Sequence, residues 1–508
     1  MRDCKTLRQC FSESVRRCGD RIAISFYRGE TLETEIGYRE LWADAGRLAG
    51  TFVQMGVGRG ARVLLFMPKS LFFVTAHLAL QRLGAVAVPL NPGFKRNEVA
   101  YLAGDADAVL AVAGPAQAEI LRRVDGGLRT VVVDTQRPYR DIDFFRRAPA
   151  EPPEVEVLPD DPALIIYTSG TTGRPKGAVL TQRNLVHDAG NVIGIWRISD
   201  TDVLCHALPL FHVHGLCFAL HTALMAGSRV VMLDAFRPEQ VLAHLARREG
   251  DAVCTVFMAV PAMYTKLMEA VGDRRPDFDH LRLLTSGSAP LLPGDFEAIR
   301  RVFGKAPVER EGMSETGMNF SNPIDGVRKP GSIGLPLPGV SVRIVDPRTL
   351  RDVAPGEEGE IWLKSAAITP GYWRKPAETA EAFHDGWFRS GDLGKVDADG
   401  YYYLTDRIKH IIISGGENIS PKEVELVLNR MPGVVESCVV GVTDEKWGER
   451  VAAALVPAPG ARIDYEAVKA HCRRHLHDWK CPRQVVLVES LPRNTMGKVL
   501  KEEVKKLF

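Results

Sequence analysis

Residues 163–177 read ALIIYTSGTTGRPKG, an apolar run that passes directly into a loop of glycines and hydroxyl side chains. The apolar run predicts a buried strand. The eleven residues from Tyr167 to Gly177 include three glycines, four Ser or Thr hydroxyls and one lysine, Lys176. Glycine lets the backbone approach a ligand, while hydroxyls and lysine add donors for phosphate oxygens. The stretch predicts a strand followed by a phosphate-binding loop, although no Ser or Thr follows the lysine as in GxxxxGK[ST].

Short runs rich in Val, Ile and Leu alternate with helical patterns on both sides of this stretch. Such runs, without strict alternation and spaced by helices, are typical of a parallel sheet covered on both faces. We therefore expect two doubly wound α/β halves of similar build before residue 330. The expected strands are residues 62–67, 85–89, 109–112, 130–133, 203–206, 229–233, 253–256 and 281–285.

The pattern changes near residue 331, where glycines and prolines lead into two alternating segments, residues 341–345 and 359–363. Alternation predicts an antiparallel β element. After the polar stretch at 406–409, the pattern predicts a compact α+β module. We therefore expect an N-terminal domain over 1–405, a linker over 406–410 and a C-terminal domain over 411–508.

Composition narrows the function. The 508 residues are too many for one core, so two or three domains are expected. A net charge of +2 gives no reason to expect a nucleic acid or a membrane surface as partner. No apolar run reaches the roughly 18–20 residues of a spanning helix, and the first twenty residues lack an apolar signal core. Nine cysteines without a CxxC pair favour reduced thiols, so the cytoplasm is the expected compartment.

Six further motifs follow the loop along the chain. Together with it they resemble, in order, the signatures of the adenylate-forming superfamily, which contains acyl-CoA synthetases, peptide-synthetase adenylation domains and luciferases. The resemblance covers nearly the whole chain. The motifs are SGSAP at 286–290, EGMSE at 311–315, SGD at 390–392, DRIK at 406–409, GGENI at 415–419 and PRNTMGK at 492–498.

The resemblance implies an acid–CoA ligase that uses ATP, Mg²⁺ and coenzyme A. Such an enzyme forms an acyl-AMP and then a thioester, and it must supply positive charge where two anions meet. By resemblance, Lys498 contacts the carboxylate and the α-phosphate, while Glu315 holds Mg²⁺. Asp392 accepts hydrogen bonds from the ribose, and Arg407 reaches the ribose or phosphates.

Further roles are also implied by the resemblance. The small C-terminal domain is expected to be mobile, rotating about Lys409 between the two half-reactions, with Gly415 and Gly416 then facing the pantetheine arm. The implied nucleotide-binding residues are Thr168, Ser169, Gly170, Thr171, Thr172, Gly173, Lys176, Gly287, Ser288, Ala289, Pro290, Glu311, Gly312, Met313, Ser314, Asp392 and Arg407.

The chain departs from the family pattern at Glu311, which replaces the tyrosine that stacks on adenine. Glu311 has no π-face and adds negative charge near the triphosphate. We expect weaker ATP binding unless Glu311 pairs with Arg310 or another cation. Ser314 in place of threonine keeps the hydroxyl, and His410 stands where an acidic residue is usual.

Residues 209–215 (PLFHVHG) resemble the acid-pocket entrance of CoA ligases. By this resemblance His212 is a catalytic and substrate residue, with Val213 and Met318 helping to set the pocket size. The aspartate that binds the substrate amine in peptide-synthetase domains is not found, which disfavours amino acids.

Residues 257–268 and 312–323 look most like the malonyl-CoA synthetase branch, so malonate or methylmalonate is the expected acid. A dicarboxylate needs a cation for its far carboxylate, and Arg282 is the candidate. The alternatives are another short or branched acid, a medium-chain or aryl monocarboxylic acid, a carrier-protein-loading enzyme, or a luciferase-like oxygenase.

Overall fold

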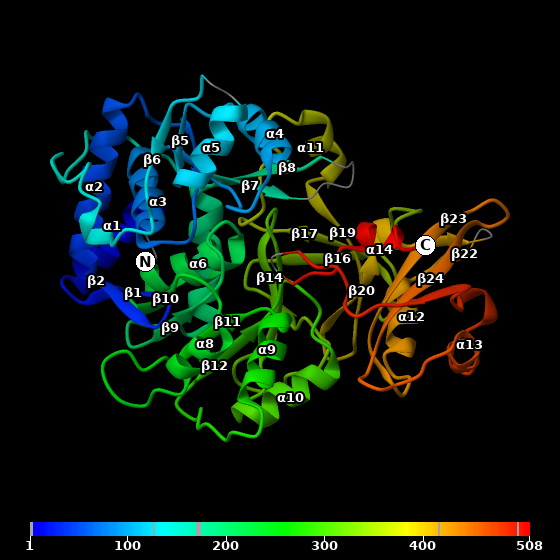
Figure 1. Ribbon diagram of the computed structural model, residues 1–508. Coiled ribbons are helices and arrows are strands. Elements are labelled where there is room, and N and C mark those ends of the chain that lie inside the picture. The colour runs from blue at the N-terminus through cyan, green and yellow to red at the C-terminus, as the bar shows by residue number, and fades with distance from the viewer. Residues whose placement is uncertain (1–3, 125–126, 169–173, 415–416, 495–496) are drawn as a thin grey trace. The chain divides into compact units, whose positions relative to one another are not determined.

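A computed structural model describes residues 4–124, 127–168, 174–414, 417–494 and 497–508 (Figure 1). The chain forms two compact units. The first contains residues 1–341 and 364–388, and the second contains residues 342–363 and 389–508. The predicted linker at 406–410 therefore lies inside the second unit, and its role as a hinge stays a prediction.

A six-stranded sheet carries the phosphate-loop stretch in the first unit. Its strands follow the order β6-β5-β3-β4-β7-β8 and are parallel except for the last pair. The loop after β7 thus leads into an antiparallel strand. The bounds are β3 Arg62–Phe66, β4 Val86–Pro89, β5 Leu110–Ala113, β6 Thr130–Val132, β7 Pro162–Thr168 and β8 Lys176–Thr181.

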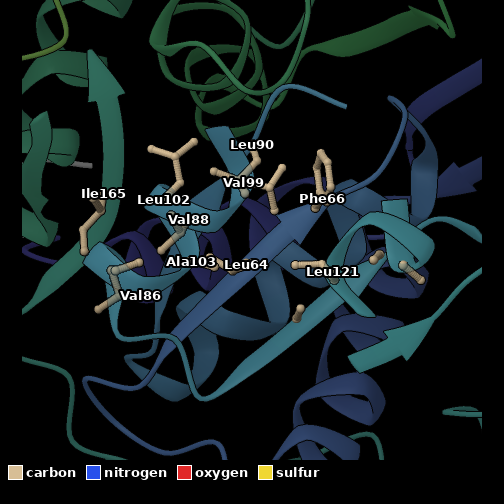
Figure 2. Close-up of a cluster of buried hydrophobic side chains, with 14 of the residues drawn as sticks. Leu64, Phe66, Val86, Val88, Leu90, Val99, Leu102, Ala103, Leu121 and Ile165 are labelled. Carbon is tan, nitrogen blue, oxygen red and sulfur yellow. The ribbon is translucent and has the colours of Figure 1, made fainter. Parts of the chain in front are cut away.

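The helices between these strands cover the sheet with an apolar core. Figure 2 shows Leu64 and Val88 of the strands packed with Val99 and Leu102 of α4 (Arg96–Ala106). Leu121, on α5 (Pro115–Val124), belongs to the same cluster. Each such side chain gains roughly 1.5–3 kcal/mol by leaving water, so the apolar runs fix the sheet in place.

A second, nine-stranded sheet follows the order β15-β14-β13-β12-β11-β9-β10-β1-β2. The N-terminal hairpin β1-β2 belongs here, because Ile24 of β1 pairs in parallel with Val230 of β10 (blue beside green in Figure 1). The bounds are β1 Ile22–Arg28, β2 Thr31–Gly37, β9 Val203–His206, β10 Arg229–Leu233, β11 Val256–Ala259, β12 Leu283–Ser286, β13 Val308–Met313, β14 Gly317–Ser321 and β15 Leu335–Pro336.

The other helices of the first unit include one π-helix, His214–His221, between β9 and β10. A short hairpin, β18 (Phe383–His384) with the start of β19 (Trp387–Val396), also lies in this unit. The α-helices are α1 Leu7–Cys18, α2 Tyr38–Gln54, α3 Leu71–Leu83, α6 Gln182–Trp196, α7 Thr222–Ala226, α8 Pro238–Leu245, α9 Pro261–Val271, α10 Pro293–Phe303 and α11 Pro376–Ala382.

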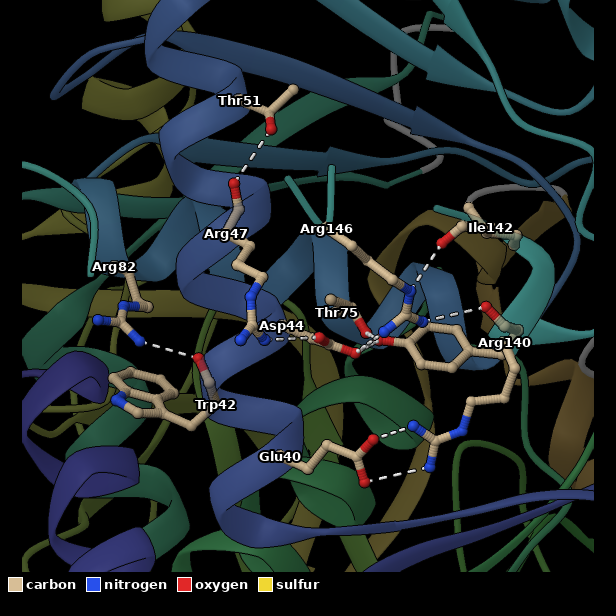
Figure 3. Close-up of polar contacts among 11 residues, drawn as sticks. Glu40, Trp42, Asp44, Arg47, Thr51, Thr75, Arg82, Arg140, Ile142 and Arg146 are labelled. Carbon is tan, nitrogen blue, oxygen red and sulfur yellow. Dashed lines mark hydrogen bonds and ion pairs between the residues drawn. The ribbon is translucent and has the colours of Figure 1, made fainter. Parts of the chain in front are cut away.

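A buried carboxylate, Asp44 of α2, binds the segment that begins with the 3₁₀-helix Tyr139–Asp141. Figure 3 shows Asp44 with Arg47 and Arg146. Asp44 accepts hydrogen bonds from the Tyr139 hydroxyl at 2.7 Å and from Arg146 at 2.9 Å. Arg47 forms a third contact at 3.2 Å. A buried charge needs such partners, so this cluster has a structural role.

The described residues of the second unit form two sheets, three α-helices and two 3₁₀-helices. β16 (Ser341–Val345), β17 (Gly359–Lys364), β19 and β20 (Tyr402–Arg407) form the expected β element. The α+β module follows it. Its elements are β21 Ile412–Ser414, β22 Glu417–Ile419, α12 Pro421–Leu428, β23 Val434–Asp444, β24 Gly448–Pro457, α13 Tyr465–Arg473, β25 Gln484–Leu487 and α14 Lys501–Lys505.

The predicted fold class is confirmed: two α/β subdomains and a β element are followed by a small α+β module. None of the described helices is both long and apolar enough to cross a bilayer.

Candidate active site

The phosphate end of the site gathers at the carboxyl end of β7. The Thr168 hydroxyl donates to Oε1 of Glu315 at 3.1 Å, and the Tyr372 hydroxyl donates to the same oxygen at 3.2 Å. Lys176 places its ammonium 5.3 Å from the centre of the Tyr372 ring. Three predicted residues thus meet around a tyrosine that the motifs did not single out. Ser169, Gly170, Thr171, Thr172 and Gly173 lie outside the described residues.

The residues present fit a magnesium ion. Glu315 is buried, and burial together with the charge of Glu315 raises the pKa of Tyr372 well above its usual range, so the tyrosine remains a donor. Within the described ranges, no three His, Cys, Asp or Glu side chains form a metal-binding group. Mg²⁺ commonly takes one or two carboxylates and completes its shell with phosphate oxygens and water. The Glu315 carboxylate and the Thr168 hydroxyl could therefore supply the protein ligands of a magnesium ion.

The loop at 286–290 begins where β12 ends. Ser288 adopts a left-handed backbone with φ of +67°, and its Oγ lies 3.1 Å from Nδ1 of His214. A Cβ on Gly287 would lie 2.6 Å from Nε of Arg310, so only glycine fits there. Ala289 and Pro290 complete the loop as it turns away from the strand.

The hairpin of β13 and β14 carries the residues at 311–315. Oε2 of Glu311 accepts a hydrogen bond from Asn319 at 3.0 Å, and its charge favours the charged form of Arg310. Glu311 is only half-buried, so it remains at the surface of the site. A Cβ on Gly312 would lie 2.7 Å from the carbonyl oxygen of Gly317. The absence of a side chain at Gly312 therefore lets the two strands approach closely.

The loop after β9 is held at both ends. Nε2 of His206 lies 2.8 Å from the carbonyl oxygen of Gly215, and the Lys69 ammonium lies 2.8 Å from its Nδ1. A Cβ on Gly215 would lie 2.1 Å from the carbonyl oxygen of Pro209, so glycine closes the loop onto itself. These contacts position the segment that carries His212 and Val213.

A small cavity lies between α6, the π-helix and the hairpin. It holds about 220 Å³ of space, part of it open to solvent. The predicted residues Val213 and Ser314 line it, and Met318 contacts the lining residue Asp188 through its backbone N–H. The lining residues are Leu180, Asn184, Leu185, Asp188, Val213, Cys217, Phe218, Ser314, Gly317 and Ala367.

His212 is half-buried beside Phe211, with the two ring centres 4.6 Å apart. Burial lowers the pKa of His212 to about 4, so the ring is neutral at physiological pH. The side chain is not among those that line the cavity. A neutral imidazole can orient a ligand by hydrogen bonding but adds no charge.

Four predicted residues interact within the second unit. Asp392 of β19 pairs with Arg407 of β20, with Nε and Oδ1 2.6 Å apart. Surrounding protein and the charge of Arg407 lower the pKa of Lys498 to about 8, although Lys498 is partly exposed. Burial and Arg407 also lower the pKa of Lys409. Gly415 and Gly416 lie outside the described residues.

Comparison with known proteins is consistent with this arrangement. The AMP-binding enzyme family matches residues 11–373, and the AMP-binding enzyme C-terminal domain matches residues 423–498. The chain belongs to the AMP-binding enzyme family. The resemblance to adenylate-forming enzymes is thereby confirmed.

Two curated relatives and one solved structure illustrate the proteins to which this AMP-binding enzyme is similar. It is 37% identical to a feruloyl-CoA synthase of an Amycolatopsis species, over 94% of both chains. It is 35% identical to a mitochondrial malonate–CoA ligase of Bos taurus, over 96% of this chain and 88% of the relative. ATP-bound MatB from Rhodopseudomonas palustris shares the fold with a TM-score of 0.91 and 38% identity over 99% of each chain. The AMP-binding enzyme described here is an AMP-forming acid–CoA ligase that uses ATP.

The structure contradicts the prediction for Arg282. This residue precedes β12 and therefore lies at the amino end of the sheet, whereas the site lies at the carboxyl end. Its Nε and Nη2 pair with Asp202, each at 2.6 Å. Nη1 donates to the carbonyl oxygen of Trp196, and Nη2 also donates to that of Arg197. Its donors are thus already used, and Arg282 is not a residue of the acid pocket.

The motifs missed two charged residues: Asp188, which lines the cavity, and Arg310, which contacts the lining residue Phe218. Arg310 is 2% exposed, and Asp188 is 4% exposed. The Arg310 guanidinium lies 5.1 Å from the ring centre of Phe218, a lining residue. One signal was available for Arg310: residues 309–311 are three charged side chains in a strand that enters the site. Asp188 gave no such signal, because a lone acid on a helix is usually solvated.

Proposed function

We propose that this enzyme activates a short dicarboxylic acid such as malonate or methylmalonate with Mg²⁺-ATP and transfers it to coenzyme A. The observation that carries the proposal is the state of Arg310. None of its three guanidinium nitrogens has a hydrogen-bond partner among the residues that the structure describes. Burial lowers its pKa only to about 10, so the group is charged at neutral pH.

Burial of a guanidinium without a hydrogen-bond partner is costly, because only the ring of Phe218 and the charges of Glu311 and Asp188 offset its loss of water. A ligand carboxylate matches its planar, forked donors. The Arg310 guanidinium lies over the ring of Phe218, which lines the cavity, and beside Gly287. The missing partner is therefore assigned to the far carboxylate of the acid.

The groups in and beside the cavity bear on the choice of acid. Its lining is mostly apolar, and the buried Arg310 contacts one lining residue, Phe218. Both the malonate–CoA ligase and the feruloyl-CoA synthase lie at similar identity, so identity alone does not choose between them. A buried cation that has no hydrogen-bond partner among the described residues favours the dicarboxylate.

The residues of the site suit the two steps. Lys498 supplies positive charge to the carboxylate and α-phosphate, and the Asp392–Arg407 pair presents a carboxylate to the ribose. When bound at Glu315, Mg²⁺ neutralises charge on the phosphate oxygens. Lys409 is proposed as the hinge about which the C-terminal domain rotates between the two steps. Lys498 would serve the first step, and Gly415 and Gly416 would face the pantetheine arm of CoA in the second. All nine cysteines are free, which suits a reducing compartment such as the cytoplasm.

The test is a panel of acids assayed for CoA-dependent release of AMP. Malonate and propionate are close in size, so their ratio reports recognition of charge. A site built for the far carboxylate leaves its donors unpaired with propionate, so kcat/KM should favour malonate by about 10³. Equal or better use of propionate or butyrate would refute the dicarboxylate. AMP release that does not depend on CoA would refute the acceptor.

A further inference from the structure

A buried carboxylate in the acyl pocket, Asp188, has no role in the proposed reaction. It lies on α6, lines the cavity and is 4% exposed. Its Oδ1 accepts a hydrogen bond from the Met318 backbone N–H at 2.8 Å. A Cβ on Gly317 would lie 2.7 Å from that oxygen, so glycine permits the close approach of β14. The carboxyl group is therefore fixed in the wall of the pocket.

The charged and titratable groups around Asp188 come from two other elements. Arg310 of β13 interacts with it through charge, but the two form no hydrogen bond. Cys217 of the π-helix has its thiol pKa raised by burial and by Asp188, so it stays neutral. On α6 itself, His187 has a pKa lowered by burial. Arg310 is thus the only cation among these neighbours.

Burial and Arg310 act on Asp188 in opposite directions. Loss of water favours its protonated form, while the hydrogen bond from Met318 and the charge of Arg310 favour its ionised form. Burial is the larger effect, and the pKa of Asp188 is raised to about 7. The buried carboxyl group of Asp188 thus interacts through charge with a guanidinium that has no hydrogen-bond partner among the described residues.

We propose that Asp188 is a specificity-determining residue that controls whether the acyl pocket accepts an anion. In its protonated form, Asp188 donates a hydrogen bond to the far carboxylate that Arg310 binds. In its ionised form, it repels that carboxylate and neutralises Arg310, so the pocket favours an uncharged acyl end. This inference rests on the proposed dicarboxylate function.

The reason lies in the charge of the closed pocket. One guanidinium, one protonated carboxyl and one bound carboxylate sum to zero, and each oxygen can meet a donor. With Asp188 ionised, two carboxylates share one cation in a dry site. This arrangement is unfavourable because the two negative charges repel each other. Binding of a dicarboxylate above neutral pH therefore takes up a proton, and its affinity falls toward tenfold per pH unit. A monocarboxylate has no such requirement.

The experiment measures the adenylation half-reaction by ATP–pyrophosphate exchange with malonate and propionate from pH 6 to pH 9. Omitting CoA removes the ionisation of its thiol, and the ratio of the two kcat/KM values cancels effects on ATP and Lys498. The wild-type ratio should fall at least tenfold between pH 7 and pH 9. In Asp188→Asn, which keeps an acceptor for Met318, the ratio should not vary with pH. It should also exceed the wild-type ratio at pH 9 at least tenfold.

Asp160→Asn is the matched control. Asp160 pairs with Arg183 near the start of the same helix, and its side chain is 77% exposed. The control removes the same charge from the surface and should keep the wild-type pH profile. A thermal unfolding curve checks that both variants are folded.

The outcomes separate this inference from the proposed function. A wild-type ratio that favours malonate but does not change with pH would overturn the role of Asp188 and leave the dicarboxylate proposal standing. If the wild type prefers propionate at every pH and Asp188→Asn gains use of malonate, Asp188 controls charge but malonate is not the native acid. If neither protein uses malonate, both ideas are wrong.

Discussion

Arg282 directly precedes β12 and Arg310 lies on the neighbouring strand β13, yet their surroundings are opposite. Arg282 precedes β12 at the amino end, where Asp202 and two carbonyl oxygens occupy its donors. Arg310 lies beyond the carboxyl end of β12, where its guanidinium meets Phe218 and no described acceptor. The first arginine holds the fold together. The second has guanidinium donors without a described partner, and these could bind a ligand.

The largest expected effect concerns a third cation, Lys498, which is proposed to face the carboxylate and the α-phosphate. Burial and the charge of Arg407 lower the pKa of Lys498 to about 8, whereas the charge of Asp392 acts in the opposite direction. Lys498→Ala should lower adenylation by about 10³ or more, as loss of a charge-stabilising donor does. Thioester formation from supplied acyl-AMP should be spared.

Separate assays of the two half-reactions check this prediction. An equal loss in both, with the fold intact, would show that Lys498 does not serve adenylation alone.

Replacing the two arginines by methionine tests the comparison directly. Arg310→Met should lower the malonate to propionate ratio of kcat/KM by about 10³, because the far carboxylate loses its cation. Arg282→Met should leave that ratio unchanged. Steady-state kinetics with both acids and saturating ATP measure it. A shift of the ratio by Arg282→Met and not by Arg310→Met would reverse the assignment.

The same two variants should differ in stability. Arg282→Met leaves Asp202, 3% exposed, without its ion pair, at a cost of about 2 kcal/mol after discounting for the partly exposed arginine. Arg310→Met replaces an unpaired buried charge by an apolar chain of similar length, which should be neutral or stabilising. Thermal unfolding of both proteins should show a lower transition for Arg282→Met alone. A clear loss in Arg310→Met would mean that Arg310 is paired in the free protein.

The smallest effect is expected at Glu311. Glu311→Tyr should lower the KM for ATP about fivefold, because a ring stacked on adenine adds roughly 1 kcal/mol beyond burial. The KM for the acid should change little. Glu311→Gln serves as control, since it removes the charge without adding a ring. An unchanged or raised ATP KM in the tyrosine variant would assign Glu311 a positive role through Asn319 or Arg310.

Local sequence determined a large part of this protein. The run at 163–167 and its companions predicted the strands, since apolar side chains must leave water wherever they lie in the chain. The motif order identified the family, and with it the meeting of Thr168, Lys176 and Glu315, which the structure brings together. Asp392 and Arg407, both expected near the ribose, form an ion pair, and their roles toward the nucleotide stay predictions.

Only the tertiary structure decided what the sequence left open. The pairing of β1 with β10 joins residues 24 and 230, and no local pattern encodes a partner so distant. The choice between Arg282 and Arg310 depends on which end of β12 each side chain reaches and on which acceptors lie there. Asp188 enters the pocket because α6 packs beside β14, where Met318 and Gly317 hold it. A charge acquires a function from the groups that surround it, and those groups come from distant parts of the chain.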